Sequence, residues 1–174
     1  DRRDRFVPTY DEDAAKEAET KLTSLSQPLT PSNAEEIAAR ADRLYTSRNW
    51  VEADKAYAAL AASYPAALSP GVNLKRLIVL ANVKKMADAQ NVFGLIQGSA
   101  AEKEPAFYEL TVGYAKNRLW PDARRTADEM RRAYPAGKLT PKAWVDAGLA
   151  ARDARNKGEE QYFFGSALSN FPNA

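Results

Sequence analysis

Two short stretches of this chain combine a base, a tryptophan and an acid within five positions, which is enough chemistry for a small binding site. The residues are Arg48, Trp50 and Glu52 in SRNWVEA, and Arg118, Trp120 and Asp122 in NRLWPDA. An indole ring stacks on ligands, and the charged groups beside it pair with them. The same residues can equally form a structural joint that recurs along the chain. The spacing of related residues distinguishes the two interpretations.

Related stretches occur between these two and after them. Residues 84–89 read KKMADA and residues 155–160 read RNKGEE, with Met86 in the place of the tryptophan. Aligned on the residue that ends each stretch, the four copies fall at Ala53, Ala89, Ala123 and Glu160. This is a period of about 35 residues, typical of helical repeats. We therefore interpret the two tryptophans as packing residues at joints between helices, and their charged neighbours as turn and helix-start residues.

The composition and motifs of the chain exclude several kinds of catalytic and metal-binding site. The 174 residues contain no Cys and no His, which excludes disulfides, thiol nucleophiles, zinc–thiolate sites and a Ser-His-Asp triad. No GxSxG, GxGxxG or P-loop motif occurs, so we predict a non-catalytic chain with no cofactor, catalytic residue or metal. The net charge of +2 does not indicate a nucleic-acid partner. No apolar run approaches the ~18 residues of a membrane span.

Helical periodicity surrounds each joint. An amphipathic run with apolar residues three and four positions apart precedes it, and a second helical run follows it. The second run usually ends at an aromatic residue followed by proline, since proline excludes the preceding residue from the α region. These pairs are Tyr64-Pro65, Tyr134-Pro135 and Phe171-Pro172. Ala, Glu, Lys, Arg and Leu dominate and β-branched residues are sparse, so the predicted fold class is all-α.

On these residues the chain resembles the tetratricopeptide repeat (TPR) family, whose unit is a helix–turn–helix of about 34 residues. The matching positions are Ala41, Ala53, Tyr57 and Pro65 in the first copy, Phe107, Leu110, Tyr114, Ala123 and Pro135 in the third, and Trp144, Gly148, Phe164, Ala167 and Pro172 in the fourth. The resemblance implies a right-handed TPR-like α–α solenoid of about four repeats. Their expected ranges are 34–67, 70–103, 104–137 and 141–174.

The turn between the two helices departs from the family pattern, which usually has glycine where the first helix ends. Arg48, Lys84, Arg118 and Arg155 occupy that place, and Asn49, Asn117 and Asn156 lie beside three of them. Because asparagine tolerates left-handed backbone geometry, we expect these asparagines to turn the chain in the place of glycine.

Residues 1–33 form an N-terminal extension outside the four repeats. A helix is expected over about residues 11–25, with Ala14, Ala18, Leu22 and Leu25 on one face, followed by a turn over residues 26–31. Ser32 or Asn33 is expected to cap the next helix. This first helix is interpreted as a cap or as the end of a preceding repeat.

In the TPR family the first helices of the repeats line a concave groove, and the resemblance implies which residues line it here. They are Tyr45, Leu74, Ile78, Tyr108, Val112, Lys116, Val145, Leu149 and Arg152, with Asp42 beside them. An apolar strip with two bases suits a helical or extended peptide. Alternatively, some of these side chains pack against neighbouring first helices.

A second surface is basic. Arg124, Arg125, Arg131, Arg132 and Lys138 gather in and after the second helix of the third repeat. They form either a solvated face or a site for an anionic polymer or lipid headgroups.

The leading expectation is a scaffold or interaction module that binds a protein or peptide partner through the groove. A second resemblance, carried by the turn Leu29-Thr30-Pro31 and the run 41–45 (ADRLY), is to the helical superstructure of bacterial soluble lytic transglycosylases. It implies a non-catalytic periplasmic solenoid that meets peptidoglycan through a parent enzyme; a cytoplasmic location stays open. A third alternative is self-association through the last repeat, because no polar capping helix follows it in this sequence. A segment cut from a longer protein would explain the same feature.

Overall fold

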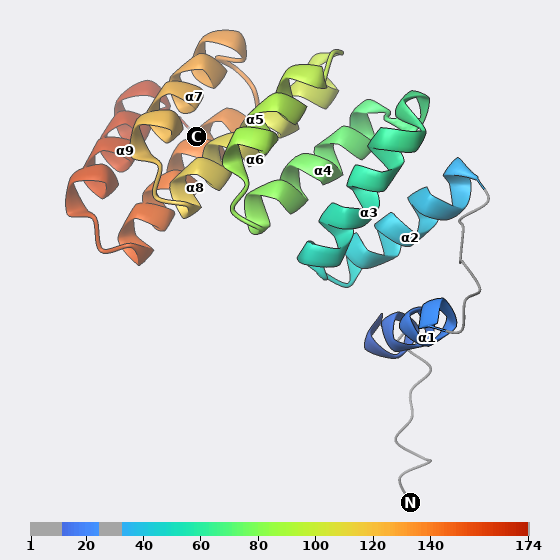
Figure 1. Ribbon diagram of the computed structural model, residues 1–174. Helices are drawn as coiled ribbons and strands as arrows, with labels where there is room; N and C mark the ends of the chain where they lie inside the picture. The colour runs from blue at the N-terminus through green and yellow to red at the C-terminus, as the bar shows by residue number, and fades with distance from the viewer. Residues whose placement is uncertain (1–11, 25–32, 174) are drawn as a thin grey trace, which may run out of the picture. The chain divides into compact units, whose positions relative to one another are not determined.

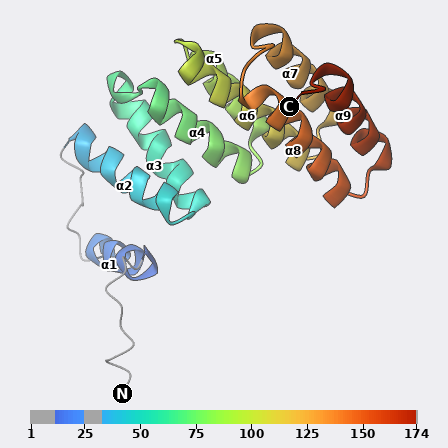
Figure 2. The ribbon, with the colours of Figure 1, turned by 180° about the vertical axis from the view of Figure 1, so that it is seen from behind.

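A computed structural model describes residues 12–24 and 33–173 of the chain, and these residues form α-helices, one short 3-10 helix and no strand. The all-α prediction is thereby confirmed. The chain divides into two compact units, residues 1–63 (unit 1) and 64–174 (unit 2). Figures 1 and 2 show the helices from opposite sides.

Unit 1 contains one helical hairpin and a preceding helix. Its helices are α1 (Glu12–Ser24), α2 (Ala34–Thr46) and α3 (Trp50–Ser63). The predicted cap is confirmed at Asn33, whose side chain accepts a hydrogen bond from the N–H of Glu36 at 2.9 Å. The buried apolar residues of the hairpin are Ile37, Ala41, Leu44, Ala53, Ala56, Tyr57 and Leu60. Their spacing of three and four positions is what places them on the facing sides of α2 and α3.

The helix α1 lies where the sequence predicts one. Two ion pairs join it to the hairpin: Lys16 Nζ lies 3.1 Å from Glu52 Oε1, and Arg40 Nε lies 2.8 Å from Glu19 Oε1. The side chains of Leu22 and Leu25, the turn at residues 26–31 and Ser32 lie outside the described residues, and the predictions on them stay predictions.

Unit 2 contains three hairpins. Its helices are α4 (Pro70–Asn82), α5 (Met86–Leu95), α6 (Ala100–Lys116), α7 (Trp120–Ala133), α8 (Leu139–Asp153) and α9 (Lys157–Asn170), preceded by the 3-10 helix η2 (Pro65–Ala67). α4 packs on α5, α6 on α7 and α8 on α9, and the first helices α4, α6 and α8 also pack side by side. α6 starts at Ala100, inside the range expected for the second repeat, because Ser99 and Glu102 form a capping box there.

One apolar core runs through unit 2. Leu77, Met86, Phe93, Leu110, Met130 and Trp144 are among its buried members. Small residues fill the closest approaches: Ala89, Ala123, Ala127, Ala143 and Ala147 have no exposed surface. Burial of this kind contributes roughly 25 cal/mol for each Å² of apolar surface removed from water. The alanine content therefore reflects helices that pack at short distance.

All four hairpins turn through the same hydrogen-bond pattern. In the third, the N–H of Arg118 donates to the carbonyl of Ala115 at 3.0 Å, and the N–H of Leu119 donates to that of Tyr114 at 2.9 Å. The equivalent pairs of bonds occur at Arg48, Lys84 and Arg155. They form a Schellman motif, which satisfies the last carbonyls of the first helix. The carbonyl of Leu119 then accepts from the N–H of Ala123 at 2.9 Å and starts the second helix.

The left-handed residue of each turn is the base and not the asparagine, so that expectation was wrong. Arg48, Lys84, Arg118 and Arg155 have φ of 57°, 64°, 60° and 56°. Asn117 and Asn156 have φ of −88° and −99° and act as the C-cap of α6 and the N-cap of α9. A non-glycine residue in this region costs about 1–2 kcal/mol relative to right-handed geometry. Positive charge at a helix C-terminus offsets part of that cost, about 0.3–1 kcal/mol.

The aromatic residues of the two opening stretches lie at helix starts. Trp50 and Trp120 begin α3 and α7, as Met86 begins α5. The Trp50 ring meets Tyr45 edge-on at 5.8 Å between centroids, and Trp120 packs against the core of unit 2. Their acids pair nearby, Glu52 with Lys16 and Lys55, and Asp122 with Arg125. This geometry agrees with the interpretation of both stretches as joints.

Candidate functional site

Eight of the nine residues predicted to line the groove lie on the three first helices of unit 2. Leu74 and Ile78 are on α4, Tyr108, Val112 and Lys116 on α6, and Val145, Leu149 and Arg152 on α8. Tyr45, on α2, belongs to unit 1, together with Asp42, which accepts a hydrogen bond from the Tyr57 hydroxyl at 2.7 Å. The candidate site therefore consists of unit 2 residues.

The predicted apolar strip divides into an exposed part and a packed part. Val145 and Leu149, one helical turn apart on α8, are each 41 % exposed. Val112 is only 5 % exposed, and Leu74 packs against the core of unit 2. The exposed pair on α8 is thus the part of the strip that offers apolar surface to a partner.

A cleft of about 190 Å³ opens between α4 and α6. Its lining is Ile78, Ala81, Asn82, Lys84, Glu109, Val112, Gly113, Lys116 and Asn117. Three residues of the predicted groove, Ile78, Val112 and Lys116, therefore meet in one place. The Asn117 side-chain amide ties the helices together, because its Nδ2 donates to the carbonyl of Ala81 at 3.2 Å and to that of Gly113 at 2.8 Å.

Glu109 is the one acid that lines this cleft. Its burial raises the pKa of the carboxyl group above the ordinary value, while the positive charges of Lys116 and Lys142 act in the opposite direction and Asp146 adds to the rise. Burial disfavours a charge because the protein interior solvates it less well than water does. Ionisation of Glu109 therefore lowers the free energy of unfolding. Such buried ionisable groups are often found at binding sites.

A pH-dependent prediction follows for Glu109→Gln. Because the pKa of Glu109 is raised in the folded protein, ionisation costs stability, and this cost appears as the pH rises through the folded-state pKa. The neutral glutamine avoids it, so the variant is expected to be more stable than the wild type at pH 7. The gain should shrink as the pH falls to about 4. Urea unfolding at several pH values measures it.

Glu129→Gln is the matched control, because the Glu129 side chain is 48 % exposed on α7. As a surface substitution, it is expected to change the free energy of unfolding by less than about 0.5 kcal/mol. A Glu109→Gln variant that is equally stable or less stable than the wild type at pH 7 would contradict the assigned cost.

Next to the cleft, Tyr108, Lys142 and Asp146 form a polar cluster across α6 and α8. The Tyr108 hydroxyl donates to Asp146, and Lys142 Nζ lies 2.6 Å from that hydroxyl and 2.7 Å from Asp146 Oδ2. Burial first, and then the bond to Asp146, raise the pKa of Tyr108. The bond from Lys142 to Asp146 raises the pKa of Lys142, which keeps the ammonium charged. The cluster therefore ties α6 to α8 at the edge of the site.

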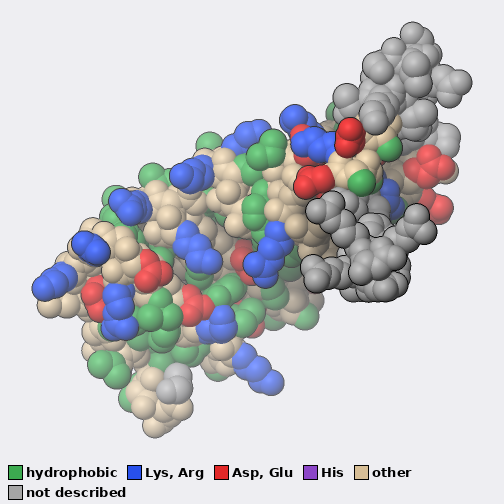
Figure 3. Space-filling view, turned by 90° about the horizontal axis from the view of Figure 1, so that it is seen from below, with side chains coloured by type: hydrophobic (Ala, Val, Ile, Leu, Met, Phe, Trp, Pro, Cys, Tyr) green, Lys and Arg blue, Asp and Glu red, His purple; other side chains and the backbone are tan. Residues whose placement is uncertain are grey.

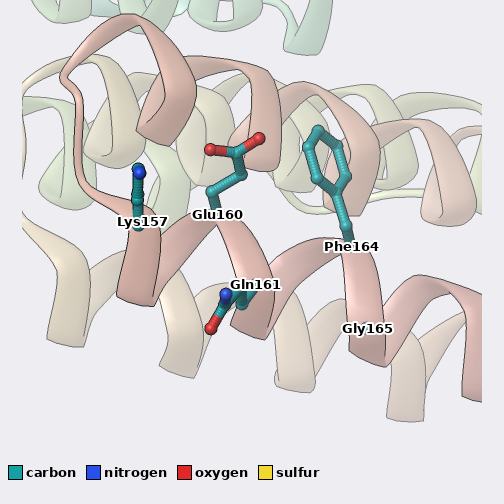
Figure 4. A pocket seen from close by; sticks show the side chains of 5 residues that line it. All are labelled: Lys157, Glu160, Gln161, Phe164 and Gly165. Atoms are coloured by element: carbon teal, nitrogen blue, oxygen red, sulfur yellow. The ribbon is translucent and has the colours of Figure 1, made fainter.

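A second shallow cleft, of about 400 Å³, lies on α9 and is lined by Lys157, Glu160, Gln161, Phe164 and Gly165 (Figure 4). Arg152, the last predicted groove residue, pairs with Glu160 at 2.9 Å and lies 5.2 Å from the Phe164 ring centroid. Phe164 also covers Gly148, where an added Cβ would lie 2.5 Å from the ring. The base at Arg152 is thus already neutralised within the hairpin.

The basic surface of α7 is largely paired. Arg124 contacts Glu159 at 2.8 Å, Arg125 contacts Asp122 at 2.9 Å, and Arg131 and Arg132 both contact Asp128, at 2.7 and 2.6 Å. Figure 3 shows Lys and Arg side chains scattered among acidic and apolar ones over the face it presents. This favours the interpretation of α7 as a solvated face.

No protein family, curated protein or solved structure matches the chain.

Within residues 12–24 and 33–173, no group of acids is arranged to hold a metal ion. None of the helices in that part of the chain combines the length and apolarity that crossing a bilayer requires.

Sequence reasoning did not include Glu109, Lys142 and Asp146, and it placed Asn117 in the turn without a role at the cleft. Two of these carried a readable signal: Glu109 lies seven positions before Lys116, on the same helical face, and Lys142 lies four before Asp146. The contact of Tyr108 with Asp146 spans 38 positions and depends on how α6 packs on α8. No local pattern reports such a contact.

Proposed function

We propose that this chain is a non-catalytic interaction module of the TPR-like solenoid type, which binds a partner polypeptide along the first helices α4, α6 and α8. The observation that carries the proposal is the side-by-side packing of these three helices, which gathers eight predicted groove residues on one set of elements. The four hairpins each reverse through a turn with the same hydrogen-bond pattern, and this repetition supports the solenoid class.

The binding surface has the two components that peptide grooves use. Val145 and Leu149 supply exposed apolar contact area, and the α4/α6 cleft supplies a recess with an aliphatic floor and polar rim. Apolar anchors give affinity, and the polar groups beside them fix register and orientation. The alternatives of a transglycosylase superstructure in the periplasm and of self-association rest on the sequence alone.

Selection from a random peptide display library tests this function. Peptides selected on the wild-type protein are expected to bind a Val145→Glu/Leu149→Glu variant at least about ten-fold more weakly, because two charges replace the exposed apolar anchors. Both side chains are exposed, so the variant should keep its helical circular dichroism and its stability within about 1 kcal/mol.

The matched control is Leu95→Glu/Leu168→Glu, which changes two exposed apolar residues on the second helices α5 and α9 of unit 2, 58 % and 76 % exposed. It is expected to bind like the wild type. Selected peptides that bind the Val145/Leu149 variant with undiminished affinity would refute the groove as the binding surface.

A further inference from the structure

The turns of unit 2 carry a row of bases that the proposed function does not use. Lys84, Arg118 and Arg155 lie two residues after the ends of α4, α6 and α8, and all three side chains are exposed. Their side chains make no hydrogen bond or ion pair with the described residues, and only their backbones bond in the turns. Glycine adopts the same backbone geometry without the steric cost. A strained residue type retained at equivalent turns is a reason to look for a role of its side chain.

Contacts between hairpins place these turns along one edge. Asn117, next to Arg118, donates to the carbonyl of Ala81 near the end of α4 at 3.2 Å. At the next junction, Arg124 Nε lies 2.8 Å from Glu159 Oε2, and its guanidinium lies 3.8 Å from the Tyr162 ring centroid. Neighbouring packed helices are about 8–10 Å apart, so successive bases are separated by roughly that distance.

The positive charge concentrates where this edge meets the α4/α6 cleft. Residues 82–88 and 116–125 together contain six Lys and Arg and two Asp and Glu, a net +4, whereas the whole chain carries +2. Two of these six bases are already paired, Arg125 with Asp122 and Arg124 with Glu159, which lies outside the two ranges. Lys84 and Lys116 both line the cleft, beside the aliphatic side chains of Ile78 and Val112. Glu109 is the one acidic residue that lines the cleft. It is half-buried, whereas Lys84 and Lys116 are exposed.

We propose that Lys84, Lys116, Arg118 and Arg155 form a docking edge for an acidic segment of the partner polypeptide, with one aliphatic side chain of that segment in the α4/α6 cleft. The inference rests on the proposed function and names the chemistry of the partner. An extended chain rises about 3.3 Å per residue, so acids at every third position match the spacing of the hairpins. Exposed charge pairs add roughly 0.2–1 kcal/mol each and speed association.

Two other anionic partners fit the edge less well. Single-stranded nucleic acid binds where bases stack on aromatic rings, and no aromatic residue lines the α4/α6 cleft. A lipid surface takes up groups of exposed apolar side chains. Leu119, beside Arg118, is 39 % exposed, but the apolar floor of this cleft is recessed between two helices. The recess instead accepts a side chain that a polypeptide presents.

The test uses the full chain and two peptides of about 12 residues, each with a central leucine and with Glu or Gln at every third position. The Glu peptide is expected to bind the wild type more tightly than the Gln peptide, by fluorescence anisotropy in about 0.15 M salt, where screening suppresses long-range charge effects. Lys84→Gly/Arg118→Gly is expected to weaken the Glu peptide about five-fold. Glycine suits the left-handed turn, so this variant should unfold at the wild-type urea concentration or above it.

Arg132→Gln/Lys138→Gln removes the same charge from exposed positions away from the edge and is expected to change affinity less than about two-fold. The proposal is overturned if both double variants bind the Glu peptide equally, or if the wild type does not distinguish Glu from Gln. It is also overturned if a single-stranded oligonucleotide or anionic phosphatidylserine vesicles displace the Glu peptide and themselves lose binding in the Lys84/Arg118 variant. In the first two cases, library peptides that still depend on Val145 and Leu149 would leave the proposed function intact.

Discussion

Trp144→Ala is expected to lower the free energy of unfolding of unit 2 by about 3–5 kcal/mol, the usual cost of emptying a large buried aromatic site. Trp144 is 2 % exposed and joins α8 to α9. Its ring lies 5.8 Å from that of Phe163, 6.0 Å from that of Tyr162 and 6.3 Å from that of Phe171, measured between centroids. Removing the indole deletes the centre of this aromatic group, so neither helix can close the space alone.

Trp144→Phe separates ring packing from the indole N–H. The Nε1 atom of Trp144 is buried with no hydrogen-bond partner among the described residues. A buried donor without a partner costs about 1–3 kcal/mol, and phenylalanine removes that donor while it keeps an aromatic ring. We therefore expect Trp144→Phe to cost no more than about 1.5 kcal/mol, since a gain offsets part of the lost volume.

Urea unfolding followed by far-ultraviolet circular dichroism measures both variants, and amide exchange in α8 and α9 locates the effect. Leu168→Ala, at a position 76 % exposed on α9, is the control and should stay within about 0.5 kcal/mol of the wild type. If Trp144→Phe costs as much as Trp144→Ala, the indole N–H makes a bond that matters, and the account of this site is wrong.

The helices themselves could be predicted because their signals are local. Apolar spacing set their faces, and residues such as Asn33 marked their ends. The joints between helices could also be predicted, because alanine recurs at positions 53, 89 and 123, and each of these residues has 0 % exposure. Large, regular segments with local signals are the part of a fold that sequence reasoning reaches most easily.

The left-handed residue of each turn could not be predicted from propensity. Asparagine tolerates this geometry better than arginine, yet Arg48 adopts it and Asn49 does not. Leu44 and Ala53, both fully buried, flank the turn, and the chain must reverse between them. The position of the reversal is therefore fixed by the packing on either side, and the residue that falls there bears the strain.

The exposure of the candidate site residues depends on helix packing more than the positions of the helices do. Eight groove residues could be placed on first helices, but which of them stay exposed is decided by how α4, α6 and α8 approach one another. Val112 is buried by that approach, whereas Val145 at the corresponding face of α8 is not. The distances between helices are set by small residues at single positions, and Gly113 is the clearest of these.

Gly113→Leu is expected to destabilise unit 2 by about 2–3 kcal/mol and to close the α4/α6 cleft. An ideal Cβ on Gly113 would lie 3.1 Å from the Cβ of Ala81 and 3.3 Å from the Cε of Met86. The Cβ of Ala81 is bonded directly to the backbone of α4 and cannot move without it. A branched side chain at Gly113 must therefore push the two helices apart. Overpacking of this kind costs about 1–3 kcal/mol, and the bond from Asn117 to Ala81 would be lost with it.

Gly113→Ala should be close to neutral, which makes the pair of variants informative. Alanine is favoured over glycine inside a helix by about 1 kcal/mol. The single methyl group must displace Met86, whose thioether end is flexible, and press against Ala81, which is not. These effects have opposite signs and similar size, so the net change is expected to be smaller than about 0.5 kcal/mol.

Gly94 supplies the matched control, because it is also inside a helix, but an added Cβ there meets nothing within 4 Å apart from its chain neighbours and the backbone of its own helix. Gly94→Ala is expected to stabilise the protein by about 0.5–1 kcal/mol, and Gly94→Leu should not destabilise it. Thermal unfolding of the four variants compares the two positions. Equal tolerance of leucine at Gly113 and Gly94 would mean that α4 and α6 do not approach as closely as described, and the cleft that depends on this approach would lose its floor.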